Sequence, residues 1–293
     1  MSLRRLRTLV AVADERTFSA AAERVHVTHA AVSQQMQALE ADLGLALFDR
    51  RGRTPELTPV AHRVVARARW LIADYDRLVP EALGDGGLSG TIRLGAIGTT
   101  LTGLVPLALA NLKSHAPELG LHIRPGLTGA LLADIERGHL DAAIVTRPHL
   151  LPPDLILQDL VTEPMQLITA MEETEDDPLR LLTSRPYIRF NRNAVLGTLI
   201  DNWLAAQGLR VSEAMELDSA EAITSMVQAN LGVSIVPDLT VGPSVAAGVR
   251  RLSLGSDAPQ RVLALAQRRD HSNTEALEAL AVALRNTIGP QAA

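Results

Sequence analysis

Apolar residues between positions 28 and 43 recur at intervals of four, three and four, which predicts a helix with one buried face. The apolar positions are Val32, Met36, Leu39 and Leu43. The opposite face carries hydrogen-bonding or small side chains and no carboxylate before Glu40, so it does not repel phosphate and suits contact with base edges. Major-groove contacts are therefore expected from His29, Ala30, Ser33, Gln34 and Gln37.

A second, shorter helix is predicted just before this one. Ser19 is its expected N-cap, and the alanines that follow let another backbone approach closely. A tight turn precedes Thr28, the expected N-cap of the longer helix, so the pair describes a helix-turn-helix. The basic loop beyond the longer helix predicts the tip of a wing, where Arg51 and Arg53 would reach the DNA backbone or the minor groove.

A long helix is predicted from Pro59 to about residue 79, because Pro80 should end or kink it. Its apolar residues form a heptad seam at Val64, Ala68, Leu71, Tyr75 and Leu78. A helix roughly 30 Å long extends beyond the small domain before it, so the segment 59–83 is expected to pair with a second subunit. Packing on its own chain is the alternative. The glycine-rich segment 84–90 then predicts a hinge.

Strand and helix patterns alternate after the hinge, first over 91–146 and again over 187–236. This βαβα order predicts an α/β fold with a doubly wound, parallel sheet in two halves. The segments 155–170 and 261–268 are expected to be crossing strands that join the halves. The last helix, at 274–287, is expected to pack on the first half.

Charge is distributed unevenly over the 293 residues, whose formal net charge is −5. Residues 1–69 hold 11 Arg and 7 acidic residues, a charge of +4, whereas residues 70–293 carry −9. A basic first domain on an acidic body fits local DNA binding, with ordinary charge scatter as the alternative. The chain has no cysteine, which excludes disulfides and thiol-based redox sensing. We see no 18-residue apolar run and no signal core, so a cytoplasmic protein without a membrane span is expected.

Two groups of short motifs carry a resemblance to a known family. The N-terminal group is Phe18-Ser19-Ala20-Ala21-Ala22-Glu23, Ala31-Val32-Ser33, Leu39-Glu40, Leu43-Gly44, Leu47-Phe48-Asp49-Arg50 and Leu57-Thr58-Pro59. The C-terminal group is Gly95, Gly138-His139-Leu140-Asp141-Ala142-Ala143-Ile144 and Asn230-Leu231-Gly232-Val233-Ser234-Ile235-Val236-Pro237. Together they resemble the LysR-type transcriptional regulators over essentially the whole chain. His29 stands where the family usually has Gln, which bears on the preferred DNA sequence, and His62 stands where a glycine is common.

The resemblance implies a domain order and a set of partners. The implied parts are a winged helix-turn-helix DNA-binding domain at 1–58, a linker and dimerisation helix at 59–83, a hinge at 84–90 and a two-lobed α/β effector-binding domain at 91–293. That last domain is similar to periplasmic solute-binding proteins, with lobe I at about 91–161 and 268–293 and lobe II at about 162–267. The implied partners are double-stranded promoter DNA, a small-molecule effector, further copies of the chain in a homodimer and homotetramer, and RNA polymerase.

The effector is expected at the carboxyl ends of the strands, where ligands bind in open α/β sheets and where the family's effector contacts lie. The candidate residues are Thr99, Thr100, Thr102, Thr128, Thr146, Arg147, Phe190, Arg192, Ser219, Val236 and Pro237. Thr99 and Thr100 lie where a helix begins, so they suit an anion or, alternatively, merely cap that helix. Arg192 and Arg147 would pair with a carboxylate, so a small organic anion is the predicted ligand.

The sequence lacks the marks of an enzyme. The eight histidines show no metal-ligand spacing, no nucleophile elbow is present, and neither a cofactor nor a metal is expected. Two other functions remain open. An architectural DNA binder with an inert second domain would discriminate weakly between operator and random DNA. A solute-binding or enzymatic protein would use its N-terminal region only for dimerisation.

Overall fold

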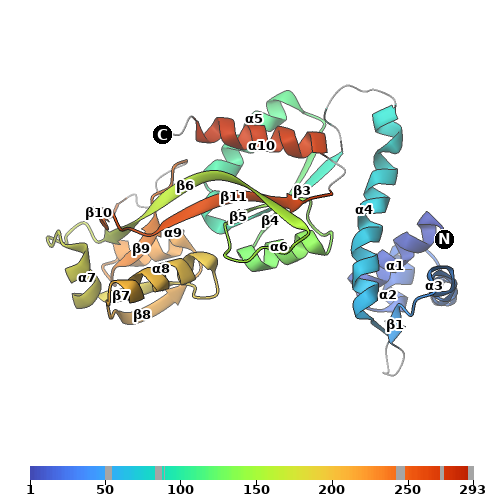
Figure 1. The fold of residues 1–293 in the computed structure, drawn as a ribbon, viewed down its shortest axis with the longest axis horizontal. Helices are drawn as coiled ribbons and strands as arrows, with labels where there is room; N and C mark the ends of the chain where they lie inside the picture. The colour runs from blue at the N-terminus through green and yellow to red at the C-terminus, as the bar shows by residue number, and fades with distance from the viewer. Residues whose placement is uncertain (50–54, 83–87, 89, 242–247, 271–273, 290–293) are drawn as a thin grey trace.

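The chain folds into an N-terminal helical unit, a long helix and two α/β lobes that follow one another along the molecule (Figure 1). This computed structural model describes residues 1–49, 55–82, 88, 90–241, 248–270 and 274–289. No helix in those ranges is long and apolar enough to cross a membrane. The predicted fold class, a helix-turn-helix followed by a two-lobed α/β domain, is confirmed.

The N-terminal unit packs three helices and a two-stranded sheet around a small core. Its elements are α1 (Leu3–Glu15), α2 (Phe18–Arg24), α3 (His29–Leu43), β1 (Phe48–Asp49) and β2 (Glu56–Leu57). Met36 and Leu39 of α3 are fully buried beside Leu9 of α1, so the predicted apolar face of α3 forms this core. Thr28 caps α3 as predicted, since its Oγ1 accepts a hydrogen bond from Ala31 N at 3.2 Å.

The start of α2 differs from the prediction. Thr17, rather than Ser19, is the N-cap, and its Oγ1 accepts a hydrogen bond from Ala20 N at 3.2 Å. Both residue types make good caps, so tertiary packing decides between them. The observed start places Phe18 in the first turn, where its ring meets the ring of Phe48 edge-on at a centroid distance of 5.2 Å.

The long helix α4 spans Pro59–Ala82 and continues two residues past Pro80. Pro80 was expected to end or kink this helix; it does not end it, because a proline in the last turn removes one helical hydrogen bond and leaves earlier turns intact. The first half of α4 packs on α1 of its own chain, with Ala68 buried between them. The apolar residues farther along the seam are exposed, namely Leu71 (47%), Tyr75 (58%) and Leu78 (59%).

Lobe I is built on a sheet in which β4, β3 and β5 lie parallel and β11 and β6 extend it antiparallel. Its elements are β3 (Thr91–Ala96), the 3₁₀ turn η1 (Gly98–Thr100), α5 (Leu104–His115), β4 (Gly120–Pro125), α6 (Thr128–Glu136), β5 (Ala142–Thr146), β6 (Leu155–Thr169), β11 (Gln260–Arg268) and α10 (Thr274–Ile288). Helices α5 and α10 lie together on one face of the sheet, and α6 lies on the other (Figure 1). Every residue of β5 is buried, as a strand covered on both faces must be.

Lobe II is joined to lobe I by β6 and β11, which run from one lobe into the other (Figure 1). Its elements are α7 (Pro178–Ser184), β7 (Pro186–Phe190), α8 (Val195–Ala206), β8 (Ser212–Leu217), α9 (Ala220–Gln228), β9 (Ser234–Pro237) and β10 (Arg250–Ser253). β9 and β10 both pair antiparallel with the far half of β6, and β7 pairs parallel with β8. The crossing strands were predicted, whereas α7 and β10 were not, because seven and four residues carry too little periodicity.

Candidate functional site

The N-terminal half of α3 presents a polar face that its own domain does not cover. His29, Ala30, Gln34 and Gln37 are exposed, and Ser33 is half-buried. All five residues predicted to contact DNA bases therefore lie on the accessible part of this helix. The two wing residues of the prediction, Arg51 and Arg53, lie outside the described residues.

The first carboxylate of α3 is directed at its own domain. Glu40 Oε1 accepts hydrogen bonds from Leu47 N at 2.8 Å and from Phe48 N at 3.1 Å, so it fixes the chain where the wing begins. Behind the helix, Gln35 Oε1 accepts a hydrogen bond from the buried Thr8 hydroxyl at 2.7 Å. These contacts orient α3, and the exposed face of its N-terminal half carries no carboxylate, as suits a surface that meets phosphate.

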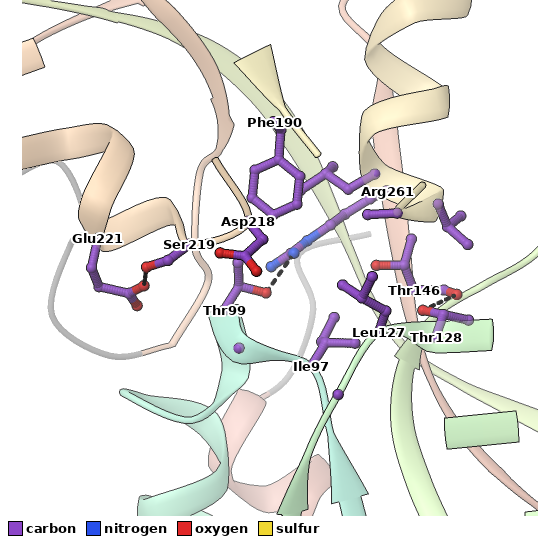
Figure 2. A pocket seen from close by; sticks show the side chains of 15 residues that line it. Ile97, Thr99, Leu127, Thr128, Thr146, Phe190, Asp218, Ser219, Glu221 and Arg261 are labelled. Atoms are coloured by element: carbon purple, nitrogen blue, oxygen red, sulfur yellow. Dashed lines mark hydrogen bonds between the residues drawn. The ribbon is translucent and has the colours of Figure 1, made fainter. Parts of the chain in front are cut away.

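A second candidate site is a cavity of about 110 Å³ at the junction of the two lobes (Figure 2). In lobe I its wall comes from the residue after β3, from η1, from the start of α6 and from the end of β5. In lobe II it comes from the end of β7, the residue after β8 and the starts of α8 and α9. It therefore lies beyond the carboxyl ends of parallel strands, where ligands of such sheets bind. Cavities of roughly 150 Å³ hold a molecule the size of benzene, so this one suits a small organic molecule.

Five of the residues predicted for the effector line this cavity. They are Thr99, Thr128, Thr146, Phe190 and Ser219. Thr99 and Phe190 come from opposite lobes and face each other across it (Figure 2). Thr100 does not line the cavity, because its buried hydroxyl donates a hydrogen bond to Ile97 O at 2.9 Å and holds the turn.

Three further residues of the prediction are not part of the cavity wall. Thr102 reaches across the lobes, and its hydroxyl lies 3.4 Å from Glu221 Oε1. Val236 and Pro237 are buried in β9, where they pair with β6. Neither of these strand residues is part of the cavity wall.

The two arginines predicted to bind the carboxylate of a ligand do not line the cavity, and this part of the prediction is corrected. Arg192 Nε donates to Glu216 at 2.8 Å and Arg192 Nη2 donates to Glu213 at 2.9 Å, both on β8. These contacts raise the pKa of the Arg192 guanidinium, chiefly through the hydrogen bond to Glu216. Arg147 Nε donates to Asp159 of β6 at 2.9 Å. Both arginines bind acids of their own lobes because those acids are nearer than the cleft.

The guanidinium that does line the cavity is that of Arg261, which the prediction missed. The Arg261 residue is 1% exposed; Nε lies 2.6 Å from Glu163 Oε2, and Nη1 donates to Thr99 Oγ1 at 2.8 Å (Figure 2). Burial lowers the pKa of Arg261, and the Glu163 carboxylate opposes that shift. Because the pKa of an arginine is so high, Arg261 stays charged. Glu163 Oε1 also accepts a hydrogen bond from Thr240 N at 2.9 Å. The available signal in the sequence was an arginine that begins an otherwise apolar strand.

The helix α4 ties the N-terminal unit to lobe I. The Cζ atoms of Arg93 and Arg268 lie 5.7 and 5.9 Å from the centroid of the Trp70 ring. On the neighbouring position Arg69 forms an ion pair with Asp14 of α1. These contacts join lobe I to α4, and α4 to α1 of the N-terminal unit.

Two family models match the chain, one over each part of this architecture. Residues 3–62 match the model for bacterial regulatory helix-turn-helix proteins of the lysR family, and residues 85–288 match the LysR substrate binding domain. The second match alone covers more than half of the chain. The chain belongs to the LysR family: it is a LysR-type transcriptional regulator with an N-terminal helix-turn-helix domain and a C-terminal effector-binding domain.

Named relatives match most of the chain at low sequence identity. The HTH-type transcriptional regulator CzcR of Bacillus cereus is 27% identical over 241 residues, 82% of each chain. A probable hydrogen peroxide-inducible genes activator of Streptomyces viridosporus is 28% identical over 98% of this chain and 94% of its own length. Among solved structures, a full-length OxyR variant from Pseudomonas aeruginosa superposes with a TM-score of 0.75 at 26% identity, covering 97% of this chain and 95% of that one.

Proposed function

We propose that this regulator binds promoter DNA through α3 and its wing, and that a small organic acid bound between the lobes alters that binding. The observation that carries the proposal is the cavity lined by both lobes, at the junction that β6 and β11 cross. A ligand held by both lobes favours one lobe arrangement over another, and only such differential binding shifts the population. Trp70 links lobe I to α4, so the shift reaches the DNA-binding unit.

The effector acts without thiol chemistry in this protein. The chain contains no cysteine, so a response to an oxidant by disulfide or sulfenic acid formation is not available to it. One relative is named as a probable hydrogen peroxide-inducible genes activator, whereas the signal proposed for this chain is a bound molecule. Hydrogen peroxide remains a useful neutral comparator in a ligand screen.

DNA is bound by a dimer that pairs through α4. Leu71, Tyr75 and Leu78 are exposed in one row on the part of α4 that its own chain leaves uncovered. Apolar residues at heptad spacing are the seam of a two-stranded coiled coil. Such a pair presents two copies of α3 to successive major grooves of a two-fold operator. Two dimers then join as a homotetramer, and the complex at the promoter contacts RNA polymerase.

The experiment measures binding of the full-length protein to DNA from upstream of its own gene, against random DNA of equal length, by fluorescence anisotropy at fixed salt. We expect the upstream DNA to bind at least about 10³-fold more tightly. Gln34→Ala should lower this ratio at least tenfold, since it removes a side chain from the exposed face of α3. Gln207→Ala is the matched control, because it makes the same change on an exposed residue at the end of α8.

Two results would refute the proposal. Equal affinity for upstream and random DNA would favour an architectural binder. An unchanged ratio in the Gln34→Ala variant would remove α3 as the surface that contacts bases. The same assay also tests the proposed effector, with a library of small organic acids added one at a time. At least one acid must change the affinity of the protein for upstream DNA.

A further inference from the structure

The charges in the cavity wall do not match a ligand that is only an anion. Among the described residues that line it, the charged ones are Asp218, Glu221 and Arg261. The single guanidinium is already neutralised by Glu163, so the wall carries an excess of negative charge. Asp218 is exposed and accepts no hydrogen bond from any described residue, whereas Glu221 Oε2 accepts one from Ser219 at 2.7 Å. A simple carboxylate would meet this excess without compensation.

The opposite end of the cavity is rich in donors. The helices α6 and α8 begin in its wall, with Leu127 and Ala194 at their N-cap positions, and among the described residues no side chain caps their free N–H groups. Free N–H groups and the dipole at a helix start favour an anionic group. Thr128 and Thr146 add hydroxyl groups at this end.

A buried group independent of the helix ends also points to a ligand. Arg261 is 1% exposed, and its Nη2 atom donates no hydrogen bond to any described residue. That nitrogen lies 2.6 Å from Glu163 Oε2, which is an ion-pair distance, but the angle does not permit a hydrogen bond. A buried donor of this kind is normally satisfied, and an oxygen of a ligand in the cavity would satisfy it.

Glu221 and the donor groups lie at opposite ends of the cavity, and Asp218 lies between them in the view of Figure 2. In Figure 2, Ser219 and Glu221 lie at one side, and Thr128 and Thr146 lie at the other. The surfaces between them are apolar, formed by Ile97, Leu127, Phe190, Val195 and Leu196. The cavity thus offers an acidic end, an end rich in N–H donors and an apolar wall within about 110 Å³.

We infer that the effector is a zwitterion, an α-amino acid with a small apolar side chain. Its ammonium group binds at Asp218 and Glu221, and its carboxylate binds at the starts of α6 and α8. The side chain fills the apolar wall. This inference rests on the proposed function, of which it specifies the ligand: the organic acid also carries an amine.

The test measures binding to the full-length protein by isothermal titration calorimetry, with three matched sets of compounds. Each set holds an amino acid, the same skeleton without the amine and the same skeleton without the carboxylate. The sets are L-alanine, propanoate and ethylamine; L-valine, 3-methylbutanoate and 2-methylpropylamine; and L-leucine, 4-methylpentanoate and 3-methylbutylamine. We expect at least one amino acid to bind tenfold or more tightly than both of its partners.

Two variants test whether the preference for an amino acid over its deaminated partner depends on the acidic residue Asp218. Asp218→Asn keeps the shape of the side chain and removes its charge, so it should weaken the amino acid at least tenfold and leave the deaminated acid equal or stronger. Asp257→Asn is the matched control, because that exposed aspartate of lobe II does not line the cavity. Thermal melting of each variant without ligand establishes that it folds like the wild type.

The possible failures separate the inference from the function on which it rests. Equal or tighter binding of a deaminated acid overturns the zwitterion and leaves the acid effector in place. An amino acid that binds Asp218→Asn as well as wild type also overturns it. If none of the nine compounds binds, the inference is also overturned. The proposed function is then tested separately by the DNA-binding assay with the library of small acids.

Discussion

Removing the charge of Glu163 should be among the most damaging single changes in the effector-binding domain. The Glu163 and Arg261 side chains are 3% and 1% exposed, so the ion pair is desolvated. In a Glu163→Gln variant the amide has one oxygen, which cannot serve both Arg261 and Thr240 N. If the oxygen faces Thr240, the amide NH₂ faces the guanidinium, and the charge of Arg261 is left buried without a counterion.

The size of the effect follows from the burial of both partners. Breaking a buried ion pair by removing one side costs about 3–5 kcal/mol, because the remaining charge is uncompensated. Replacing both sides by apolar residues of similar volume is often neutral or stabilising, since the cost of desolvating two charges also disappears. The Glu163→Met, Arg261→Met double variant should therefore unfold within about 1 kcal/mol of the wild type.

Tryptophan fluorescence isolates the relevant part of the molecule. The chain has two tryptophans, and in a Trp70→Phe background only Trp203 reports. Trp203 is 8% exposed in lobe II, where its indole Nε1 donates to Asp257 O at 2.7 Å. With a urea slope of roughly 2–3 kcal/mol/M, Glu163→Gln should lower the unfolding midpoint by about 1–2 M relative to Trp70→Phe alone.

A small loss of unfolding free energy in the Glu163→Gln variant would refute the assignment of Glu163 and Arg261 as a buried ion pair. If Glu163→Gln costs less than about 1 kcal/mol, water reaches the pair and it is not the buried contact described above. If the double variant costs as much as both single variants added, the two residues are not coupled, and the link from Thr99 through Arg261 to Glu163 carries no energy.

Three other predictions concern the DNA-binding unit and its contact with lobe I. Leu39→Ala leaves a cavity under the buried face of α3 and should cost about 2–5 kcal/mol in thermal or urea unfolding of the N-terminal unit; a smaller loss would mean that this core is not closely packed. Tyr75→Glu puts a charge on the exposed seam of α4 and should shift the dimer toward monomer in sedimentation velocity, whereas an unchanged profile would place the dimer contact elsewhere. Burial, and then the charge of Arg69, lower the pKa of His139 below 6.5, while Asp134 opposes the shift. The unfolded chain then takes up the proton first, so stability should fall as the pH drops below about 6.5, and His139→Gln should flatten that part of a melting-temperature profile between pH 5 and pH 8.

The elements that were predictable from the sequence are those determined by local patterns. The predicted helix over 28–43 matches α3, because its burial on one side and its cap at Thr28 both lie within a few residues of the helix itself. The choice between Thr17 and Ser19 as the cap of α2 was not local. It depended on the ring of Phe48, which lies thirty residues away in the sequence from Phe18.

The position of the cavity was also predictable, because the carboxyl ends of parallel strands meet at one edge. Thr99, Thr128 and Thr146 follow or end strands of lobe I, and that topology brings them into one wall. Pairing of the charges was not predictable. Arg192 follows β7 at a place typical of a ligand-binding residue, but the register of β7 on β8 brings Glu216 beside it.

Arg261 differs from Arg192 in its burial, which made its role harder to predict and makes it matter more. A surface arginine at a strand end can find a carboxylate on a neighbouring strand, and water screens what remains. A charged arginine inside a buried strand destabilises the fold unless a partner of opposite charge is buried with it, and Glu163 is 98 residues earlier in the chain. The two strands that hold this pair are the two that cross between the lobes. A ligand that contacts Thr99 or Arg261 therefore acts directly on the connection that the lobes share, and a cavity placed at this pair is suited to control their arrangement.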